Sequence, residues 1–464
     1  MIRSRNVQRL LLDARRTLKL AVPLMLAQLL TMGNGLVDAL VAGRLGPMEL
    51  AAGGIGAALW FFASLFCIGL MAGISPTLSR LIGQGRRAFV GSVFTQGLWF
   101  GVITGIVAML SAWLMIATLD NWSLDSELLP LIKQYLIPAS LSLPAFAVVM
   151  ACRNACEATG YTRGVVLIQL LGLLVNIFAD LAIGLGWFGF PKLGLQGIGI
   201  ATAVVSFSMA AALVVYLRGD RFSRYQFLSK FEKPRWLDIK PMLMMSLPIY
   251  LTLLFEAGLF TATTVQMGML GTLEAGAHNI AISISGACYM LPLGLSFALT
   301  ARAGRVYGRG AYESLKLRVA SGILITLLLA AFTVTLLLLF RYQLPALYSA
   351  DPEVRKLAAG LIALAAVFQL SDGAQVTLLG LLRGINDTRV PMMINAFSYW
   401  AIAFAAGYYS AHHLGWGAKG LWGGLILGLT IAAILLSIRL RIRIKQVGVE
   451  LQGTAASADR KSNV

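Results

Sequence analysis

Long apolar stretches separated by short polar breaks run through the whole chain. Each stretch holds roughly 20 residues or more, and a helix that rises ~1.5 Å per residue needs about that length to cross a bilayer. The alternation of apolar and polar residues that marks an outer-membrane strand is missing from these stretches. The pattern therefore predicts an all-α polytopic membrane protein with twelve transmembrane helices. They are predicted at residues 20–42, 50–77, 93–118, 129–151, 164–188, 196–217, 242–270, 276–303, 318–340, 357–381, 390–412 and 418–438.

The composition agrees with this prediction. Of the 464 residues, 58% are hydrophobic and 12% are charged, whereas soluble domains carry about 25% charged residues. The net charge of +18 comes from Lys and Arg in the breaks between apolar stretches. With twelve spans these breaks fall on one side, which is the positive-inside pattern and predicts that both termini are cytoplasmic. Because no aromatic and basic array accompanies the charge, nucleic acid is not an expected partner.

One long basic segment divides the chain into two parts. Residues 218–240 are rich in Lys and Arg and are interpreted as a cytoplasmic linker. An N-terminal lobe of six helices is predicted over residues 1–217, and a C-terminal lobe of six helices over 241–445. Residues 446–464 are polar and rich in small side chains, so they are predicted to form a disordered cytoplasmic tail.

The two halves repeat each other. A shift of 225 residues places Pro23 on Pro248, and the agreement continues without a gap for more than 70 positions. The matched pairs are Gly33 and Gly258, Gly46 and Gly271, Glu49 and Glu274, Gly69 and Gly294, Arg80 and Arg305, Gly83 and Gly308, Gly85 and Gly310, and Gly97 and Gly322. Because six spans bring each half back to its starting side, the halves should be related by an axis along the membrane normal. Two pseudo-symmetric six-helix bundles around a central cleft are expected.

Four acidic residues lie inside predicted spans, two in each half. A carboxylate in a span costs about 3 kcal/mol, so one that is kept suggests a function by default. Asp38 shares its span with Pro23, Gly33 and Gly35, which are interpreted as a hinge because proline and glycine allow a helix to bend. The alternative for Asp38 is a place at the outer membrane surface, where a charge costs little. The four acids are Asp38, Asp180, Glu256 and Asp372.

The two acids of the first half are predicted to lie together in its outer part. Asn176 stands four residues before Asp180 and therefore on the same helix face, and Thr202 is at comparable depth. Carboxylate, amide and hydroxyl oxygens suit a small hard cation such as sodium, and Asp38, Asn176 and Asp180 are its candidate ligands. The same groups would also bind a proton. A purely structural hydrogen-bonded cluster is the alternative.

The acids of the second half, together with Asp38, are candidates both for cargo binding and for cation or proton coupling, because cargo and coupling ion are expected to compete for the same negative charge. Glu256 follows Pro248 by eight residues, and the repeat places it on Thr31 of the other half. Asp372 lies in a polar patch of its span, with Gln375 one turn away on the same face. An interhelical hydrogen bond is the alternative for each acid. The three His and four Cys indicate neither a zinc site nor a disulfide framework.

Several segments resemble the multidrug and toxic compound extrusion family, MATE, in its bacterial NorM-type branch. The resemblance covers nearly the whole chain. It is carried by AVPLMLAQLL and GLVDALVAGRLGPMELAA within residues 21–52, SRLIGQGRRAFVGSVFTQG at 79–97, SLPIYLTLLFEAGLF at 246–260, LGTLEAGAHNIAISI at 270–284 and LLRGINDTRVPM at 381–392.

The resemblance implies an inner-membrane antiporter that exports amphipathic or cationic drugs and dyes in exchange for protons or sodium. It implies no cofactor other than the coupling ion, no enzymatic activity, and membrane lipid as a partner; the chain is expected to be a monomer. By position, Asp38, Glu256 and Asp372 match acids of NorM-type members, while Asn176, Asp180 and Thr202 match a cation site of other branches. Some NorM-type members have Asn in place of Asp180, so the coupling lobe and ion stay open.

Other functions fit the sequence less well. A lipid-linked precursor flippase would need Lys or Arg in its spans to bind pyrophosphate, whereas these spans hold acids. A major-facilitator-type transporter would carry an acidic and basic loop motif after the second span, which this chain lacks. A membrane enzyme would need a nucleophile or His constellation, and the only adjacent pair, His412 and His413, is predicted in an outer loop.

Overall fold

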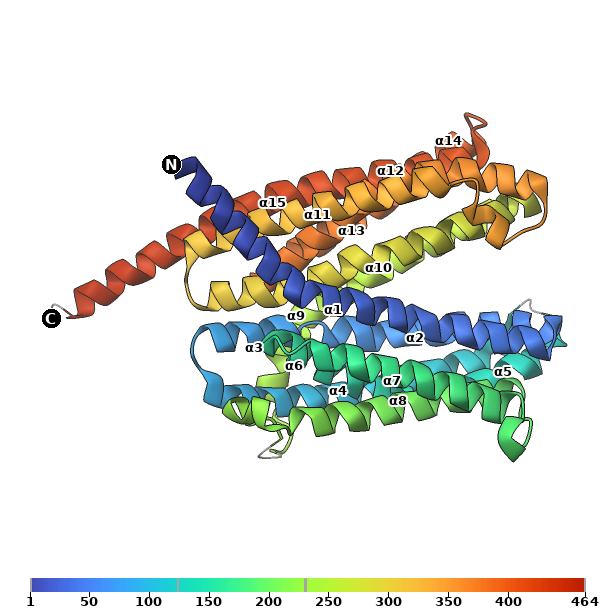
Figure 1. Cartoon of the computed structure of the whole chain (residues 1–464), viewed down its shortest axis with the longest axis horizontal. Helices are drawn as coiled ribbons and strands as arrows, with labels where there is room; N and C mark the ends of the chain where they lie inside the picture. Colours follow the sequence, from blue (N-terminus) through green and yellow to red (C-terminus); the bar gives the residue numbers. More distant parts are fainter. Residues whose placement is uncertain (1, 123–124, 229–231, 463–464) are drawn as a thin grey trace. The chain divides into compact units, whose positions relative to one another are not determined.

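A computed structural model describes residues 2–122, 125–228 and 232–462, and the side chains of residues 7–122, 125–228 and 232–449. In these ranges the chain is helical apart from short turns (Figure 1). Among the described residues, eleven helical stretches are long and apolar enough to span a membrane, and there are twelve when a bent pair is counted as one span. The predicted fold class is thereby confirmed. The main helices are α1 (Ile2–Leu45), α2 (Pro47–Met71), α3 (Ile74–Gly83), α4 (Val90–Thr118), α5 (Leu128–Ser140), α6 (Leu143–Thr159), α7 (Arg163–Ala179), α8 (Leu195–Leu217), α9 (Trp236–Leu270), α10 (Thr272–Gly308), α11 (Tyr312–Phe340), α12 (Pro352–Gly384), α13 (Arg389–Ala396), α14 (Ala405–His412) and α15 (Gly417–Ser462).

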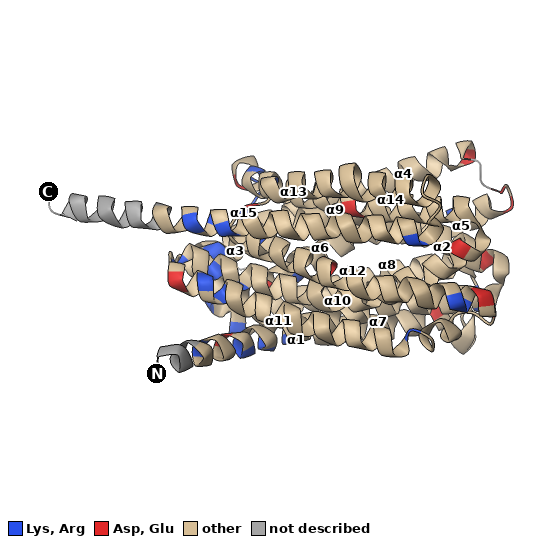
Figure 2. Cartoon of the chain, turned by 90° about the horizontal axis from the view of Figure 1, so that it is seen from above, with Lys and Arg blue, Asp and Glu red and all other residues tan. Residues whose placement is uncertain are grey.

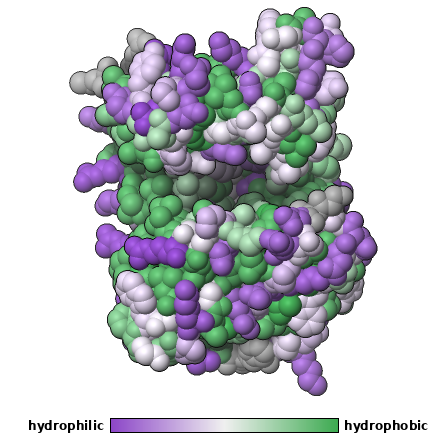
Figure 3. All heavy atoms as spheres, turned by 90° about the vertical axis from the view of Figure 1, so that its right-hand side faces the viewer, coloured by the Kyte–Doolittle hydropathy of each residue, from purple (hydrophilic) through white to green (hydrophobic). Residues whose placement is uncertain are grey.

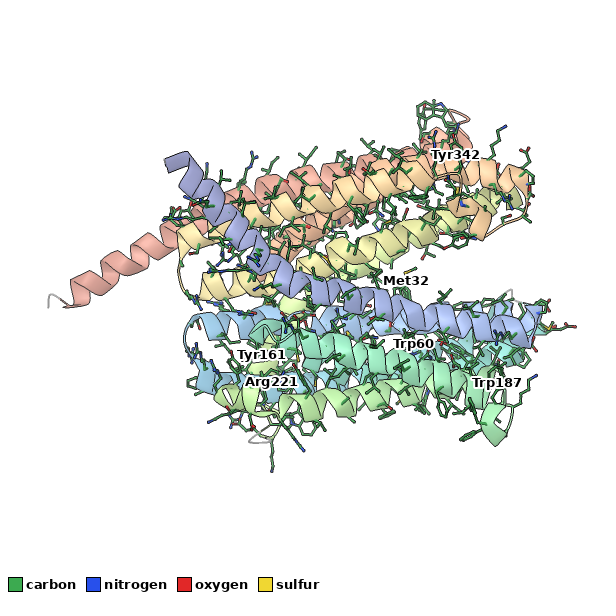
Figure 4. All side chains as sticks on the ribbon, viewed as in Figure 1. Met32, Trp60, Tyr161, Trp187, Arg221 and Tyr342 are labelled. Carbon is green, nitrogen blue, oxygen red and sulfur yellow. The ribbon has the colours of Figure 1, made fainter. Side chains whose placement is uncertain are left out.

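The fourth span is bent by 46° between α5 and α6. Pro138 and Pro144 flank the break, and a proline removes one helical hydrogen bond and clashes with the preceding turn. The indole of Trp60 in α2, labelled in Figure 4, compensates for the break. Its Nε1 donates to the carbonyl of Ala139 at 3.1 Å and to Oγ of Ser142 at 2.9 Å. The bend is therefore built into the packing of the span.

The chain forms two compact units. Unit 1 comprises residues 1–25 and 251–464, and unit 2 comprises residues 26–250. These units differ from the predicted lobes at both boundaries, because α1 and α9 each begin in one unit and continue in the other. The hydrophobic pattern predicts where such helices lie in the chain but not which bundle their first turns join. Residues 229–231 of the predicted linker lie outside the described residues.

The predicted repeat is visible in the turns that follow α1 and α9, the two helices that begin in one unit and continue in the other. Gly46 between α1 and α2 has φ of +158°, and Gly271 between α9 and α10 has φ of +153°, a region that favours glycine. In each turn a glutamate three residues later, Glu49 or Glu274, folds back over the glycine. A side chain on either glycine would collide with that carboxylate. The same local device therefore starts the second span of each half.

The fourth span of each half is largely buried; it includes α6 in unit 2 and is α12 in unit 1. In unit 2, twelve of the residues of α6 are buried. In unit 1, α12 is buried almost without interruption from Asp372 to Gly384. Close helix contacts hold α12 there, because Gly380 and Gly384 lie directly against the α10 backbone at Ser296 and Thr300. α12 is thus a fixed element, and it carries several of the predicted site residues.

Charged residues are concentrated near the helix ends. Lys and Arg gather on the terminal parts of α1 and α15, and the middle of the helices is almost free of charge (Figure 2). Hydrophilic residues also dot the helix ends seen in Figure 3. The predicted disorder is not what the structure has for residues 446–462, because α15 continues to Ser462; residues 463–464 of the predicted tail lie outside the described residues. This tail has no proline and contains good helix formers such as Ala, Leu, Gln and Lys, so it extends the preceding helix.

A buried ion cluster fixes the first turns of α1 within unit 1. Asp13 is 3% exposed and forms ion pairs with Arg302 of α10, at 2.7 Å, and Arg318 of α11. The hydroxyl of Ser321 donates to the other carboxylate oxygen at 2.6 Å. The sequence hides this role, because Asp13 stands in a basic N-terminal run and looks like a solvated residue.

We expect Asp13→Ala to destabilise the protein strongly. Removing one partner of a buried ion pair leaves an uncompensated charge and costs roughly 3–5 kcal/mol. The repeat provides a matched control, since the shift of 225 places Asp13 on Asp238, which is exposed in unit 2. Thermal unfolding of the detergent-solubilised protein, followed by tryptophan fluorescence, measures both variants. An equal loss of stability for Asp13→Ala and Asp238→Ala would contradict the structural role of the cluster.

Candidate functional site

Two polar clusters are buried among apolar helices, one in each unit. The oxygen cluster of unit 2 consists of Asp38 on α1 and of Asn176 and Asp180 at the end of α7, and Asn34 stands one turn before Asp38 on α1. The Asn176 amide donates from Nδ2 to Asp38 at 2.9 Å and to Asp180 at 3.3 Å. The Asp38 and Asp180 carboxyl groups are also close enough to share a hydrogen bond. The structure therefore brings together the three predicted cation ligands.

The geometry of both helices explains why these groups meet. Asn34 precedes Asp38 by four residues, and Asn176 precedes Asp180 by four, so each helix presents an amide and a carboxylate on one face. A short π-helical turn, Asp180–Gly184, begins at the second acid. Such turns are rare and occur frequently at functional sites, because they re-aim side chains within a helix.

Thr202 borders the cluster without joining it directly. Its hydroxyl donates to the carbonyl of Ile198 at 3.1 Å and lies near the hydroxyl of Tyr135, which lies within electrostatic range of both acids. Tyr135 is 3% exposed and is lodged between Gly56 and Gly199, where any side chain would collide with it. Sequence reasoning missed Tyr135, because nothing in its local sequence, LIKQYLIP, indicates that it lies near acids of other helices.

Two buried oxygens of this cluster, Oδ1 of Asn176 and Oδ1 of Asp180, accept no hydrogen bond, and neither does the buried Oδ1 of Asn34, one turn before Asp38 on α1. Buried polar atoms nearly always have a partner, and an unpaired one costs roughly 1–3 kcal/mol. Carboxylate and amide oxygens are the donors that hard cations prefer. The cluster thus fits a small hard cation, and Asn34 extends the predicted ligand set. The signal for Asn34 was its spacing of four residues from Asp38.

The polar cluster of unit 1 is built around α12. It consists of Glu256 on α9, Tyr289 on α10, Asp372 and Gln375 on α12, and Tyr399. The Tyr289 hydroxyl donates to Glu256 at 3.4 Å, and Gln375 Nε2 donates to the Tyr399 hydroxyl. Asp372 is 4% exposed and lies within electrostatic range of Glu256. Three predicted residues of the second half, Glu256, Asp372 and Gln375, therefore belong to one cluster.

A buried cation accompanies these acids. Arg383, near the end of α12, is 8% exposed and lies within electrostatic range of Glu256 and Tyr289. With the two carboxylates of Glu256 and Asp372 and one guanidinium, the fully ionised cluster carries one net negative charge. Sequence reasoning missed Arg383, because it stands beside polar residues that resemble a loop. Gln375 and Asn395 both donate to the Tyr399 hydroxyl, and their own oxygens, Gln375 Oε1 and Asn395 Oδ1, accept no hydrogen bond.

The predicted hinge residues lie within one uninterrupted helix. Pro23 is inside α1, a methyl group on Gly33 would touch Leu173 at 3.5 Å, and one on Gly35 would touch nothing within 4 Å. A further buried acid, Glu157, escaped the sequence reading, because it falls in the break between the spans predicted at 129–151 and 164–188. Glu157 is 2% exposed within α6 and pairs with Arg153 at 3.1 Å.

No group of three or more His, Cys, Asp and Glu side chains able to hold a metal ion is found within the described ranges. The oxygen cluster of unit 2 differs from such a group, because it has two acids, Asp38 and Asp180, beside the amide of Asn176. Its donors are suited to sodium and not to a transition metal, which prefers imidazole or thiolate ligands.

The sequence of the chain matches the MatE family model twice, over residues 23–181 and 248–409. The two matches begin at Pro23 and Pro248, which confirms the internal repeat. The chain is 37% identical over 432 residues to the "Probable multidrug resistance protein NorM" of Xanthomonas axonopodis pv. citri, covering 92% of this chain and 94% of that protein. It is 34% identical over 450 residues to "Multidrug resistance protein MdtK" of Yersinia pestis, covering 95% and 98%.

Solved structures agree in fold. The eukaryotic MATE transporter AtDTX14 matches with a TM-score of 0.86 at 16% identity, covering 96% of this chain and all of that one. The Vibrio cholerae MATE transporter VcmN in its bent form matches with a TM-score of 0.85 at 18% identity, covering 95% and 99%. The family match over both halves and the identity to NorM relatives lead to one conclusion: the chain belongs to the MATE family.

Proposed function

We propose that this protein is a secondary multidrug exporter that exchanges lipophilic, often cationic compounds for sodium ions. The relatives named NorM and MdtK are multidrug resistance proteins, and they are similar over nearly the whole chain. The observation that carries the proposal is the burial of acid clusters in both units, away from the charged helix ends. A transporter has a use for such groups, whereas a receptor or scaffold has none that would offset their cost.

The oxygen cluster of unit 2 is the proposed cation site. A proton would satisfy one carboxyl oxygen and leave the unpaired amide oxygens of Asn34 and Asn176 as they are. A sodium ion binds several oxygens at once, so it pairs these atoms together with Asp38 and Asp180. Sodium is therefore the proposed coupling ion, held by Asn34, Asp38, Asn176 and Asp180, with Thr202 and Tyr135 behind them.

The polar cluster of unit 1 is the proposed cargo site. Its net negative charge attracts a cationic compound, while Tyr289 and Tyr399 offer aromatic faces for a cation–π contact. A lipid-linked pyrophosphate would be repelled by the same charge, because Arg383 is outnumbered by Glu256 and Asp372. A cationic cargo is thus favoured over the anionic cargo of a flippase.

Exchange follows from competition for negative charge. Cargo enters from the cytoplasm or inner leaflet and neutralises an ionised acid; sodium arriving from outside replaces it as the neutralising charge. A ligand shifts a conformational equilibrium only through its different affinity for the two states. Occupied by one cation or the other, the acids favour opposite openings. The basic helix ends support cytoplasmic termini and a bacterial inner-membrane location for the working monomer.

Ethidium transport into or out of proteoliposomes tests this function directly. Sodium and proton gradients are imposed separately, with protein-free liposomes as the control. We expect a sodium gradient to drive ethidium against its concentration. Transport driven by a proton gradient alone would contradict sodium coupling, and no ethidium flux above the protein-free control under either gradient would contradict the proposed function itself.

A further inference from the structure

Both crossings between the units occur at equivalent residues of the repeat. The chain passes from unit 1 to unit 2 between Met25 and Leu26, and back between Tyr250 and Leu251. The shift of 225 residues that relates the two halves places Met25 on Tyr250. Each crossing follows a proline by two residues, Pro23 in α1 and Pro248 in α9. The two crossings are therefore one structural device present twice.

Each crossing residue packs its backbone directly onto a glycine. In unit 1, a methyl group on Gly294 of α10 would lie 2.6 Å from both N and Cα of Met25. In unit 2, a methyl group on Gly69 of α2 would lie 2.6 Å from Cα of Tyr250. Gly69 and Gly294 are themselves related by the shift of 225. Helix backbones approach this closely only where a side chain is absent.

The neighbouring turn is anchored as well. Met25 is 6% exposed and Leu24 is fully buried in the core of unit 1. On the other crossing, Ser246 is fully buried and its hydroxyl lies against Gly73, one turn beyond Gly69. The ring of Tyr250 packs on Phe66 with centroids 4.6 Å apart. The chain is thus held by close packing at each crossing, and this packing prevents the preceding turn from sliding along its neighbour.

We propose that Gly69 and Gly294 are pivots on which α9 and α1 turn during transport. At each pivot the glycine has no side chain that would obstruct the facing helix turn. That turn is also weakened, because Pro23 and Pro248 have no N–H to donate to the carbonyl four residues earlier. Any change in the relation of the units must be absorbed where the chain passes between them. At both passages, the turn that lacks a helical hydrogen bond lies at the contact where glycine leaves no side chain in the way.

The pivots also position the acids. α1 continues from Met25 to Asp38, and α9 continues from Tyr250 to Glu256. A turn at one pivot therefore reorients the helix that carries an acid of one cluster. Gly69 and Gly294 act through these helices and touch no ligand, so they are positioning residues. The inference rests on the transport function proposed above.

Gly69→Ala and Gly294→Ala test the pivots, because one methyl group obstructs each contact. The same helices provide matched controls: a methyl group on Gly54 of α2 or Gly286 of α10 meets nothing within 4 Å. We expect the maximal ethidium transport rate to fall at least tenfold in both pivot variants while ethidium binding in detergent changes less than twofold. Gly54→Ala and Gly286→Ala should match the wild type in both measurements.

A measurement independent of transport separates this inference from the proposed function. Spin labels at Leu114 in α4 and Leu339 in α11, both well exposed, report the distance between the units by electron resonance, with and without sodium. We expect a sodium-dependent distance change in the wild type and in both control variants, and none in Gly69→Ala or Gly294→Ala. If the wild type changes distance but transports no ethidium, the proposed function fails and the pivots stand.

A third variant covers the case in which the alanine substitutions prevent folding. Pro248→Ala adds no bulk at the contact and restores the missing donor, so it stiffens the same turn in a folded helix. We expect slow transport with normal ethidium binding. Wild-type transport rates and distance changes in Pro248→Ala, or in correctly folded Gly69→Ala and Gly294→Ala, would overturn the proposal.

Discussion

Asp38→Asn is expected to abolish ethidium export while the protein still folds and inserts. Asparagine keeps the shape of the side chain and can still accept the hydrogen bond that Asn176 donates to Asp38 at 2.9 Å. It loses the negative charge for which sodium and cargo compete. An interaction of about 3 kcal/mol with a cation corresponds to roughly a hundredfold in rate, which would bring transport down to the passive leak of liposomes.

The control for this prediction is an identical change at an acid outside the spans. Asp120 is exposed and pairs with Lys133 at 2.8 Å at a helix end, so Asp120→Asn should transport at the wild-type rate. Both variants are compared in proteoliposomes with a sodium gradient, after gel filtration shows that they are monodisperse. Undiminished transport by Asp38→Asn would remove the central acid from the mechanism.

The fold was predictable because it depends mainly on the lengths and order of apolar stretches along the chain. Apolar length predicts each span, and the shift of 225 residues from Pro23 to Pro248 predicts that six spans make one half. The break in the fourth span was not predictable in this way. Ser140 to Ser142 interrupt a continuous apolar run only weakly, and the bend depends on Trp60, which is 79 residues away from the carbonyl that it binds.

The candidate site was predictable where a charge stood alone in an apolar stretch. Asp38, Asp180, Glu256 and Asp372 all meet that condition, and all four lie in the two polar clusters. Residues whose burial depends on a distant helix escaped the sequence reading. Asp13 looks solvated until Arg302 and Arg318 pack around it, and nothing local distinguishes Arg383 from a basic residue at a helix end.

The sequence also did not predict which unit the first turns of α1 and of α9 join. Periodicity identifies a helix, but the choice of bundle depends on a close contact such as Met25 on Gly294. The repeat did contain a trace of this contact, because Gly69 and Gly294 were among the matched glycines. A matched glycine in an apolar helix has several explanations, and only the backbone positions select a helix crossing among them.

Replacing Glu256 by Gln and Asp372 by Asn together should abolish binding of ethidium and other cationic dyes. The two changes leave Arg383 as the only charge of the unit 1 cluster, so its net charge goes from −1 to +1 when all groups are ionised. Attraction for a cation becomes repulsion in a buried place, where charges are weakly screened. Fluorescence titration of the detergent-solubilised variant with ethidium measures the effect.

The same variant should still bind sodium, because the oxygen cluster of unit 2 is intact. Asn34→Ala provides the opposite change: it removes one unpaired oxygen from the sodium site, so retention of radioactive sodium should weaken while ethidium binding stays at the wild-type level. The two variants thus separate the sites in both directions. If Asn34→Ala lost ethidium binding, or if the double variant lost sodium, cargo and sodium would share one site, and the assignment of one cation to each unit would be wrong.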